Sequence, residues 1–336
     1  MRNLILPFIL LLTFVFSCRE NDADEGLEQK NASYDVYVAG SENDKACYWK
    51  NNVLNYLSNG DNIQASKIII ENNNIYVFGI KYISANNTEY YFWKNNVKYD
   101  LKNYLGIPST SKAYFSDFIV RNNIELFAGY VDNISSGTPN IYSLCYWKNG
   151  VKTVLQNNVT FPYRVSIDFY NNTVYCGSPT GYYKNNTFNS LSGEWGQNFA
   201  QNNNGIHHLF ISNNNKNLNC YNTDNNSLSF VNTTTLYPNL SVAKLIFDTY
   251  TNDLYTFSAE IDNLYFKNNI TINFVDSQYK RIEDMKVLNN NLYMIRSFST
   301  LTSLPLKQYK VFINNVQTQY ISGNNGSFNS IYVVQN

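Results

Sequence analysis

Histidine and charged residues are scarce in this sequence, and their scarcity excludes several classes of protein. The two histidines are adjacent, at positions 207 and 208, and no Cys-x-x-Cys or His-Glu-x-x-His motif is present, so we predict no metal site. Charged residues make up 15% of the chain, with 25 Lys plus Arg against 25 Asp plus Glu. Nucleic-acid binding needs a basic stripe that such a chain lacks. We therefore predict no cofactor and no nucleic-acid partner.

Long apolar runs are missing after the N-terminus, where no stretch approaches the roughly eighteen residues of a membrane span. The N-terminus itself has a positive start and an apolar run from Leu4 to Phe16, which has the length of a signal-peptide core. It ends in Val15-Phe16-Ser17-Cys18, which resembles the lipobox of bacterial lipoproteins. The resemblance implies that residues 1–17 are removed and that Cys18 is acylated and anchors the protein to a membrane. The alternative is an ordinary signal peptide with an incidental cysteine.

Residues 18–34 form a polar, charged stretch that cannot bury enough surface to fold, so we interpret it as a disordered tether. Its acidic residues at 22–25 could also be read as a fragment of a calcium loop, but the other ligand positions are missing. Arg19, rather than Asp, follows the cysteine. By resemblance to lipoproteins of Gram-negative bacteria, this residue and the acidic cluster imply an exported outer-membrane lipoprotein displayed at the cell surface.

Asparagine and aromatic residues are abundant instead, with 29 Tyr and 21 Phe. Apolar residues enter and leave two-residue Asn-Asn or Asn-Gly turns, which is a strong signal for β-hairpins. The clearest copies are Tyr48-Trp49-Lys50-Asn51-Asn52, Phe92-Trp93-Lys94-Asn95-Asn96 and Tyr146-Trp147-Lys148-Asn149-Gly150. Weaker copies begin at Tyr182, Leu228, Tyr265 and Val311, which gives seven in all.

Further Asn turns between these hairpins divide each unit into four short strands, with about 43 residues per unit over residues 35–336. This period predicts a single all-β domain, a β-propeller of seven four-stranded blades, or of six or eight if a weak copy is misassigned. The chain enters on a second strand at 35–40 and ends on a first strand at 330–334, so the last strand should join the first blade and close the ring. The hairpins resemble those of bacterial propeller lipoproteins with Tyr-Trp-Lys-Asn-Gly repeats, which implies fold and location more than function.

Aligning the first strands places one polar residue at an equivalent position in each blade. These residues are Lys67, Asp117, Ser166, His208, Lys244, Asp284 and Ser330. If the first strands are innermost, the set rings one mouth of the central channel, where it is a candidate ligand site by analogy with other propellers. The alternative is that these groups pair with one another and with solvent.

Other chemistry-bearing residues have simpler interpretations. Neighbouring strand residues point to opposite faces, so His207 and His208 cannot readily clamp one metal, although one of them could carry protons. Trp49, Trp93 and Trp147 share one register and are expected in the core between blades. Trp195, in a Gly-bounded loop outside the repeat, is a candidate exposed platform for a sugar. The four cysteines after Cys18 are interpreted as small buried hydrophobes.

These observations favour a monomeric, non-catalytic binding or scaffolding lipoprotein whose partner is a glycan or an envelope protein. We assign no catalytic residue. The alternative is a carbohydrate-active enzyme, a lyase or hydrolase, that uses Asp117, Asp284, Glu283 or His208. A third interpretation is a structural part of a larger envelope assembly.

Overall fold

The structure is a computed structural model of the chain. It describes residues 33–84, 87–132, 141–191, 194–211, 218–225, 227–231, 243–248, 250–258, 262–268, 270–274, 276, 278–299, 307–322 and 326–336. Contacts divide the chain into a large unit, Val36–Val334, and a small one, Met1–Asp35 with Gln335–Asn336. The predicted signal peptide, Cys18 and the tether up to residue 32 lie outside the described residues.

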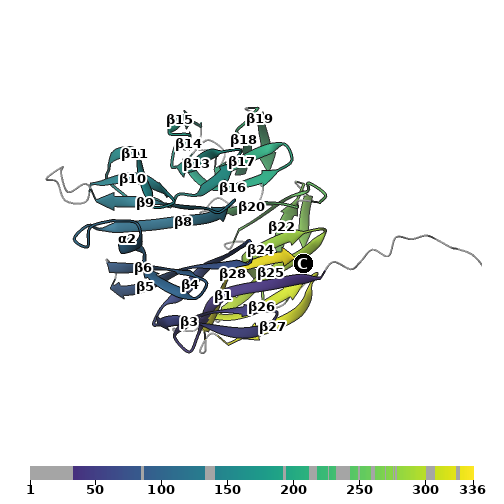
Figure 1. Cartoon of the computed structure of the whole chain (residues 1–336). Helices are drawn as coiled ribbons and strands as arrows, with labels where there is room; N and C mark the ends of the chain where they lie inside the picture. Colours follow the sequence, from purple (N-terminus) through teal and green to yellow (C-terminus); the bar gives the residue numbers. More distant parts are fainter. Residues whose placement is uncertain are drawn as a thin grey trace, which may run out of the picture. The chain divides into compact units, whose positions relative to one another are not determined.

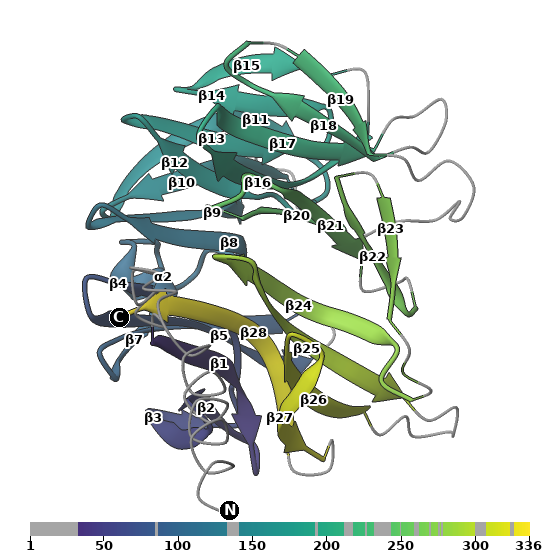
Figure 2. The ribbon, with the colours of Figure 1, turned by 90° about the vertical axis from the view of Figure 1, so that its right-hand side faces the viewer.

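The described strands of the large unit form seven antiparallel sheets of four strands each, which follow one another around a ring as the blades of a β-propeller (Figures 1 and 2). We call the first strand of each sheet its inner strand, because inner strands of neighbouring blades contact one another. The inner strands of blades one to seven are β28 (Gly326–Gln335), β4 (Gln64–Glu71), β8 (Ala113–Arg121), β12 (Ile167–Tyr170), β16 (Glu194–Asn202), β20 (Ala243–Phe247) and β24 (Arg281–Leu288).

The other three strands of each blade follow outward in the same order. The second strands are β1 (Tyr34–Glu42), β5 (Asn74–Ser84), β9 (Ile124–Asp132), β13 (Thr173–Ser178), β17 (Gly205–Ile211), β21 (Leu254–Ser258) and β25 (Asn291–Ser299). The third strands are β2 (Lys45–Lys50), β6 (Asn87–Lys94), β10 (Tyr142–Lys148), β14 (Gly181–Lys184), β18 (Leu218–Asn222), β22 (Leu264–Lys267) and β26 (Lys307–Ile313). The fourth strands are β3 (Val53–Asp61), β7 (Val97–Asp100), β11 (Val151–Val159), β15 (Thr187–Ser190), β19 (Ser227–Val231), β23 (Ile270–Asn273) and β27 (Val316–Ile321).

Blade one is completed by the last strand of the chain. Its order is β28-β1-β2-β3, so a C-terminal strand pairs with the N-terminal hairpin. The predictions of seven blades and of closure by the last strand are therefore confirmed. Closure satisfies the backbone groups that an open sheet edge would leave unpaired.

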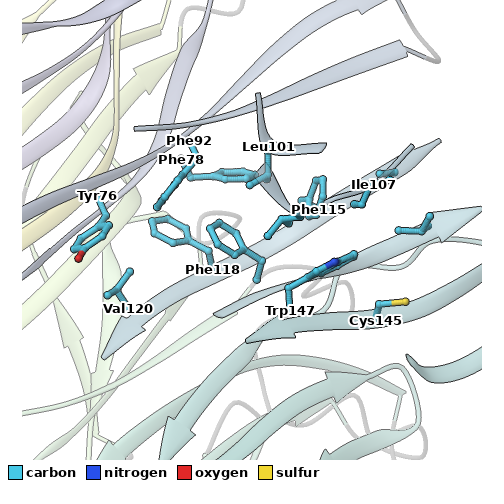
Figure 3. Close-up of a cluster of buried hydrophobic side chains, with 14 of the residues drawn as sticks. Tyr76, Phe78, Phe92, Leu101, Ile107, Phe115, Phe118, Val120, Cys145 and Trp147 are labelled. Carbon is cyan, nitrogen blue, oxygen red and sulfur yellow. The ribbon is translucent and has the colours of Figure 1, made fainter. Parts of the chain in front are cut away.

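Seven clusters of buried apolar residues hold the blades together, one at each junction between neighbours. Figure 3 shows the cluster between blades two and three, where the Phe118 ring lies 5.8 Å from that of Phe78 and 5.9 Å from that of Phe92. Each such ring contributes about 1.5–3 kcal/mol through burial. Because every sheet buries both faces against its neighbours, no blade is stable alone.

Trp49, Trp93 and Trp147 lie at equivalent places on third strands, and all three are buried in these junctions. Their predicted role in the core is confirmed. The indole Nε1 of Trp93 donates a hydrogen bond to the Ser58 carbonyl of the preceding blade at 2.9 Å. No partner for Trp147 Nε1 is found in the part of the chain that the structure describes.

The repeated Lys-Asn-Asn turn joins the third and fourth strands of a blade. In blade two, Asn95 and Asn96 have φ of 50° and 65°, which asparagine tolerates better than most residues. The Asn95 side-chain Oδ1 also accepts a hydrogen bond from the Ile75 N–H at the start of β5, at 2.9 Å. The same bond is made in other blades by Asn51, Asn149, Asn185, Asn268 and Asn314. The first asparagine thus fastens one hairpin to the other.

The second asparagine of the turn reaches the preceding blade in three cases. Asn96 Oδ1 accepts the Ser58 N–H at 2.7 Å, Asn52 donates to the Thr318 carbonyl at 3.2 Å, and the Tyr146 hydroxyl donates to Asn186 at 3.0 Å. The turn therefore links neighbouring blades as well as neighbouring strands.

The lysine of the motif lies over an aromatic ring. Lys94 Nζ lies 5.5 Å from the centre of the Tyr76 ring, its cross-strand partner on β5. Lys50, Lys184 and Lys267 make the same contact with Tyr37, Tyr175 and Tyr255. At about 0.5–1 kcal/mol each, these contacts give the scattered lysines a structural role.

The one-turn helix α2 (Leu101–Tyr104) follows β7 and begins at Asp100, whose side chain accepts the Asn103 N–H at 2.9 Å. No helix within the described residues has the length and apolar character that crossing a bilayer requires.

Candidate functional site

Each blade contributes one polar residue at an equivalent position, on its inner strand or, for Ser166, directly before it, and we call the set the inner polar ring. Its members are Lys67, Asp117, Ser166, Asn198, Lys244, Asp284 and Ser330. In β4, β8, β16 and β24 this residue follows directly after a β-bulge. Since a bulge re-aims the side chain that follows it, the repeated bulges mark the ring as a built feature.

Side chains of the ring bind the backbone of the next inner strand. Asp117 Oδ2 accepts the Ile167 N–H at 3.1 Å, and Asp284 Oδ2 accepts the Ile331 N–H at 2.9 Å. The Asn198 amide oxygen accepts the Leu245 N–H at 2.9 Å. These bonds join blade three to four, five to six and seven to one.

Ion pairs connect two further junctions. Lys67 Nζ lies 2.5 Å from Asp117 Oδ1, and Lys244 Nζ lies 2.8 Å from Asp284 Oδ1. Burial alone would raise the pKa of Asp284, but the Lys244 charge and the hydrogen bonds from Lys244 and Ile331 outweigh it, and the pKa is lowered. Asp284 is therefore held as a carboxylate at neutral pH.

A second layer of charge lies further along the same strands. Arg121 Nη1 contacts Asp168 Oδ1 at 2.7 Å, and this carboxylate also accepts the Phe169 N–H and the Gln201 side-chain amide. Burial raises the pKa of Asp168, although Arg121 opposes the shift. The carboxylate is buried, and its Oδ1 accepts three hydrogen bonds, which offset the cost of burying the charge.

Lys286 lies two residues beyond Asp284 on β24. Burial lowers its pKa, Asp284 opposes the shift, and the charges of Lys67, Lys244 and Arg121 lower it further. Those residues come from four different inner strands, so Lys286 lies where the inner strands converge on the axis. We call Lys67, Asp117, Arg121, Asp168, Lys244, Asp284 and Lys286 the axial cluster.

The structure brings together four of the predicted ligand-binding residues, Lys67, Asp117, Lys244 and Asp284, on adjacent pairs of inner strands. They form ion pairs with one another, which is the alternative to ligand binding that we gave from the sequence. Their role in ligand binding stays a prediction. Sequence alignment of the inner strands missed Arg121, Asp168 and Lys286, which were not compared across blades.

His208 does not belong to the ring, and the sequence-based assignment was wrong. It lies on the second strand β17, paired with Phe199 of the inner strand, and Asn198 takes the ring position. The His208 ring is buried with its centre 4.4 Å from that of Phe199 and 5.8 Å from that of Tyr182. Burial lowers its pKa to about 3, so it is neutral and unsuited to carrying protons at neutral pH.

His207 points to the other face of the same strand, as expected. Its ring centre lies 4.7 Å from that of Phe247 in blade six. Within the described residues, no group of three or more His, Cys, Asp or Glu side chains is arranged to hold a metal ion.

Trp195 was predicted in a loop outside the repeat, and this too was wrong. It belongs to β16, because residues 194–202 pair with 205–211 around a turn at Asn203 and Asn204. Its side chain lies outside what the structure describes, and its role as a sugar platform stays a prediction.

The four cysteines after Cys18 are free thiols buried in the blades, as interpreted from the sequence. Burial raises the pKa of Cys145 to about 11 and that of Cys220 to about 12. These thiols are therefore protonated and unreactive at neutral pH.

The proposed acid pair Glu283 and Asp284 is separated by the strand geometry. Glu283 accepts a hydrogen bond from the Ser297 hydroxyl at 2.5 Å and pairs with Lys307 at 3.2 Å, whereas Asp284 turns to Lys244 and Ile331. Each carboxylate is engaged by its own partners, an arrangement that suits positioning and recognition better than proton transfer.

No family model matches the sequence, and no curated protein matches it. Among solved structures the chain is similar to apo AztD from Citrobacter koseri, with 9% identity and a TM-score of 0.48 over 90% of this chain and 98% of that one. It is also similar to a mutant of AofleA from Arthrobotrys oligospora, with 12% identity and a TM-score of 0.41 over 90% and 92%. The SapL1 lectin in complex with alpha methyl fucoside matches with 11% identity and a TM-score of 0.36 over 77% and 94%. At these values the likenesses carry no argument about function.

Proposed function

We propose that this chain is a lipid-anchored protein of the Gram-negative cell surface whose propeller binds a glycan or an envelope protein without catalysing a reaction. The anchor rests on the lipobox-like segment that ends at Cys18. The binding role rests on the axial cluster, in which charged groups from several blades converge on one place.

The observation that favours binding over catalysis is the complete engagement of the acids. Asp117 and Asp284 each contact a lysine and a backbone N–H of the next blade, and His208 is neutral among aromatic rings. A general acid or base must exchange a proton with its substrate, which such fixed carboxylates do poorly. Charged groups held in place are suited instead to orienting a ligand at little entropic cost.

Binding is tested with the full-length chain in detergent micelles, immobilised and exposed to glycan arrays and to cell-envelope extracts. We expect retention of a defined ligand that is released by high salt. Retention of nothing would refute the binding role. Turnover of a polysaccharide that is lost in Asp117→Asn or Asp284→Asn would replace it with the carbohydrate-active enzyme.

The anchor is tested separately by replacing Cys18 with Ser. The wild-type chain should sediment with membranes and take up a labelled fatty acid, and the variant should do neither. A wild-type chain that stays in the soluble fraction would refute the anchor.

A further inference from the structure

The axial cluster has one cation more than it has carboxylates. Lys67 pairs with Asp117, Arg121 with Asp168, and Lys244 with Asp284, each at 2.8 Å or less. Lys286 is the fourth cation, and it makes no ion pair with any described residue. The cluster thus carries a formal charge of +1.

Glu71, further along β4, has a partner of its own. Its carboxylate accepts the Asn122 N–H of the next blade at 2.7 Å. Burial and then the Glu71 charge raise the pKa of Tyr332, so this carboxylate lies on the Tyr332 side of the axial cluster. The carboxylate that raises the pKa of Lys286 belongs to Asp284, which is already bound to Lys244 and to Ile331.

The surface that the cluster leaves open is mainly cationic. The paired cations Lys67, Arg121 and Lys244 keep 34%, 38% and 31% of their side-chain surface exposed. Their partners Asp117, Asp168 and Asp284 keep only 20%, 7% and 9%. A molecule that approaches these groups therefore meets ammonium and guanidinium groups before it meets carboxylates.

Lys286 is largely buried by its neighbours but keeps part of its surface exposed. Its Nζ lies 5.4 Å from the centre of the Tyr332 ring on β28, which is also partly exposed. A cation beside an aromatic face is an arrangement that suits an acidic sugar, because the cation can bind the carboxylate while the ring contacts the apolar face of the pyranose.

We propose that the axial cluster binds the carboxylate of an acidic saccharide, with Lys286 as the direct contact and the three paired cations adding attraction. This inference rests on the proposed binding function and names its ligand chemistry. The Tyr332 ring beside Lys286 offers a contact to the apolar face of a pyranose that inorganic phosphate or sulfate cannot make.

The test uses the full-length chain in detergent and titration calorimetry with glucuronic acid, with glucose as its neutral counterpart. We expect glucuronic acid to bind and glucose to bind at least tenfold more weakly. Lys286→Met should weaken glucuronic acid binding at least tenfold. The variant should fold, since it removes a charge that burial disfavours.

Lys310→Met is the matched control. Lys310 also lies over a tyrosine ring in blade seven, 4.1 Å from the centre of Tyr279, but outside the axial cluster. Its replacement should leave binding within twofold of the wild type.

Three results would overturn the inference. These are equal binding of glucose and glucuronic acid, tighter binding of inorganic phosphate or sulfate than of glucuronic acid, and unchanged glucuronic acid binding in Lys286→Met. If the array identifies a neutral glycan or a protein while glucuronic acid fails to bind, the inference falls and the binding function stands. If nothing binds in either experiment, both fall.

Discussion

The Asp284 carboxylate of blade seven accepts the backbone N–H of Ile331 on the strand that completes blade one. The same carboxylate pairs with Lys244 of blade six at 2.8 Å. One buried side chain therefore holds three blades together at the junction where the ring closes.

Asp284→Ala should lower the free energy of unfolding by about 2–4 kcal/mol, because it leaves both the Lys244 ammonium and the Ile331 N–H without their partner. Asp284→Asn keeps an acceptor for that N–H and should cost about half as much. Urea unfolding followed by tryptophan fluorescence measures both. Asp61→Asn is the control, since the Lys45–Asp61 pair is 55% and 67% exposed and should contribute under about 1 kcal/mol. Equal losses in Asp284→Ala and Asp61→Asn would contradict the closure role.

His208 should make stability depend on pH. Its folded pKa of about 3 lies below the ordinary value of 6.5, so between these values the unfolded chain takes up a proton that the folded chain does not. The free energy of unfolding should therefore fall as pH drops below 6.5, by up to about 1.4 kcal/mol per pH unit. His208→Phe, which suits the aromatic surroundings, should lose less stability than the wild type between pH 7 and pH 5. Parallel losses in the two proteins would show that His208 does not stay neutral on folding.

The first asparagine of the turn can be dissected at Asn95. Asn95→Gly keeps the positive φ and loses the bond to the Ile75 N–H, so it should cost about 0.5–1.5 kcal/mol. Asn95→Ala adds the strain of a left-handed backbone and should cost about 1–2 kcal/mol more. Asn73→Gly, in a turn with φ of 61°, is the control and should be nearly neutral. Thermal unfolding of the three variants measures these differences in stability. If Asn95→Ala were as stable as Asn95→Gly, the left-handed backbone at residue 95 would not strain an alanine.

Two buried tryptophans provide a comparison of hydrogen bonding at similar burial. Trp93→Phe removes the Nε1 bond to the Ser58 carbonyl, whereas Trp147→Phe removes a donor for which no described partner is found. Both lose packing, but Trp93→Phe should cost about 1–3 kcal/mol more, because it alone leaves a carbonyl without its donor. Denaturant midpoints of the two variants measure the difference. A larger loss in Trp147→Phe would be inconsistent with this account.

The fold followed from the sequence because its signals are local and repeated. A two-residue Asn turn needs positive φ, and an aromatic or aliphatic strand on either side needs a buried face, so each hairpin could be placed from a few residues around Asn95 or Asn149. The seven copies then required stacking, since no single sheet buries its faces alone.

The strands of blade five were assigned to the wrong places in the blade, because local turn signals alone were used to assign them. Asn runs at 202–204 and 213–215 can each close a hairpin, and a strand period of two cannot choose between them. A first strand that contains His208 would have to turn at the second run, which places Trp195 in a loop before it. The β-bulge before Asn198 carries no strong sequence signal, so the true ring residue was not recognised.

Only four of the seven residues of the axial cluster could be predicted from the sequence. Alignment of the inner strands found Lys67, Asp117, Lys244 and Asp284, but their pairing depends on contacts between blades that are about fifty and forty residues apart in the chain. Extending the same alignment by two residues would have revealed Asp168 and Lys286 at positions where the other blades have Ile, Ala or Tyr. Residues i and i+2 of a strand lie on the same face, so the residue two positions after each ring member could have been compared across the blades as well.

Ring closure by β28 has a consequence for biosynthesis. This strand leaves the ribosome after every other described strand, and blade one lacks its inner strand until then. A chain truncated before residue 326 would expose the edge of β1 and the unsealed apolar surface of Val38, Trp49 and Ile295, so nascent or truncated molecules are the form most exposed to aggregation and to proteases.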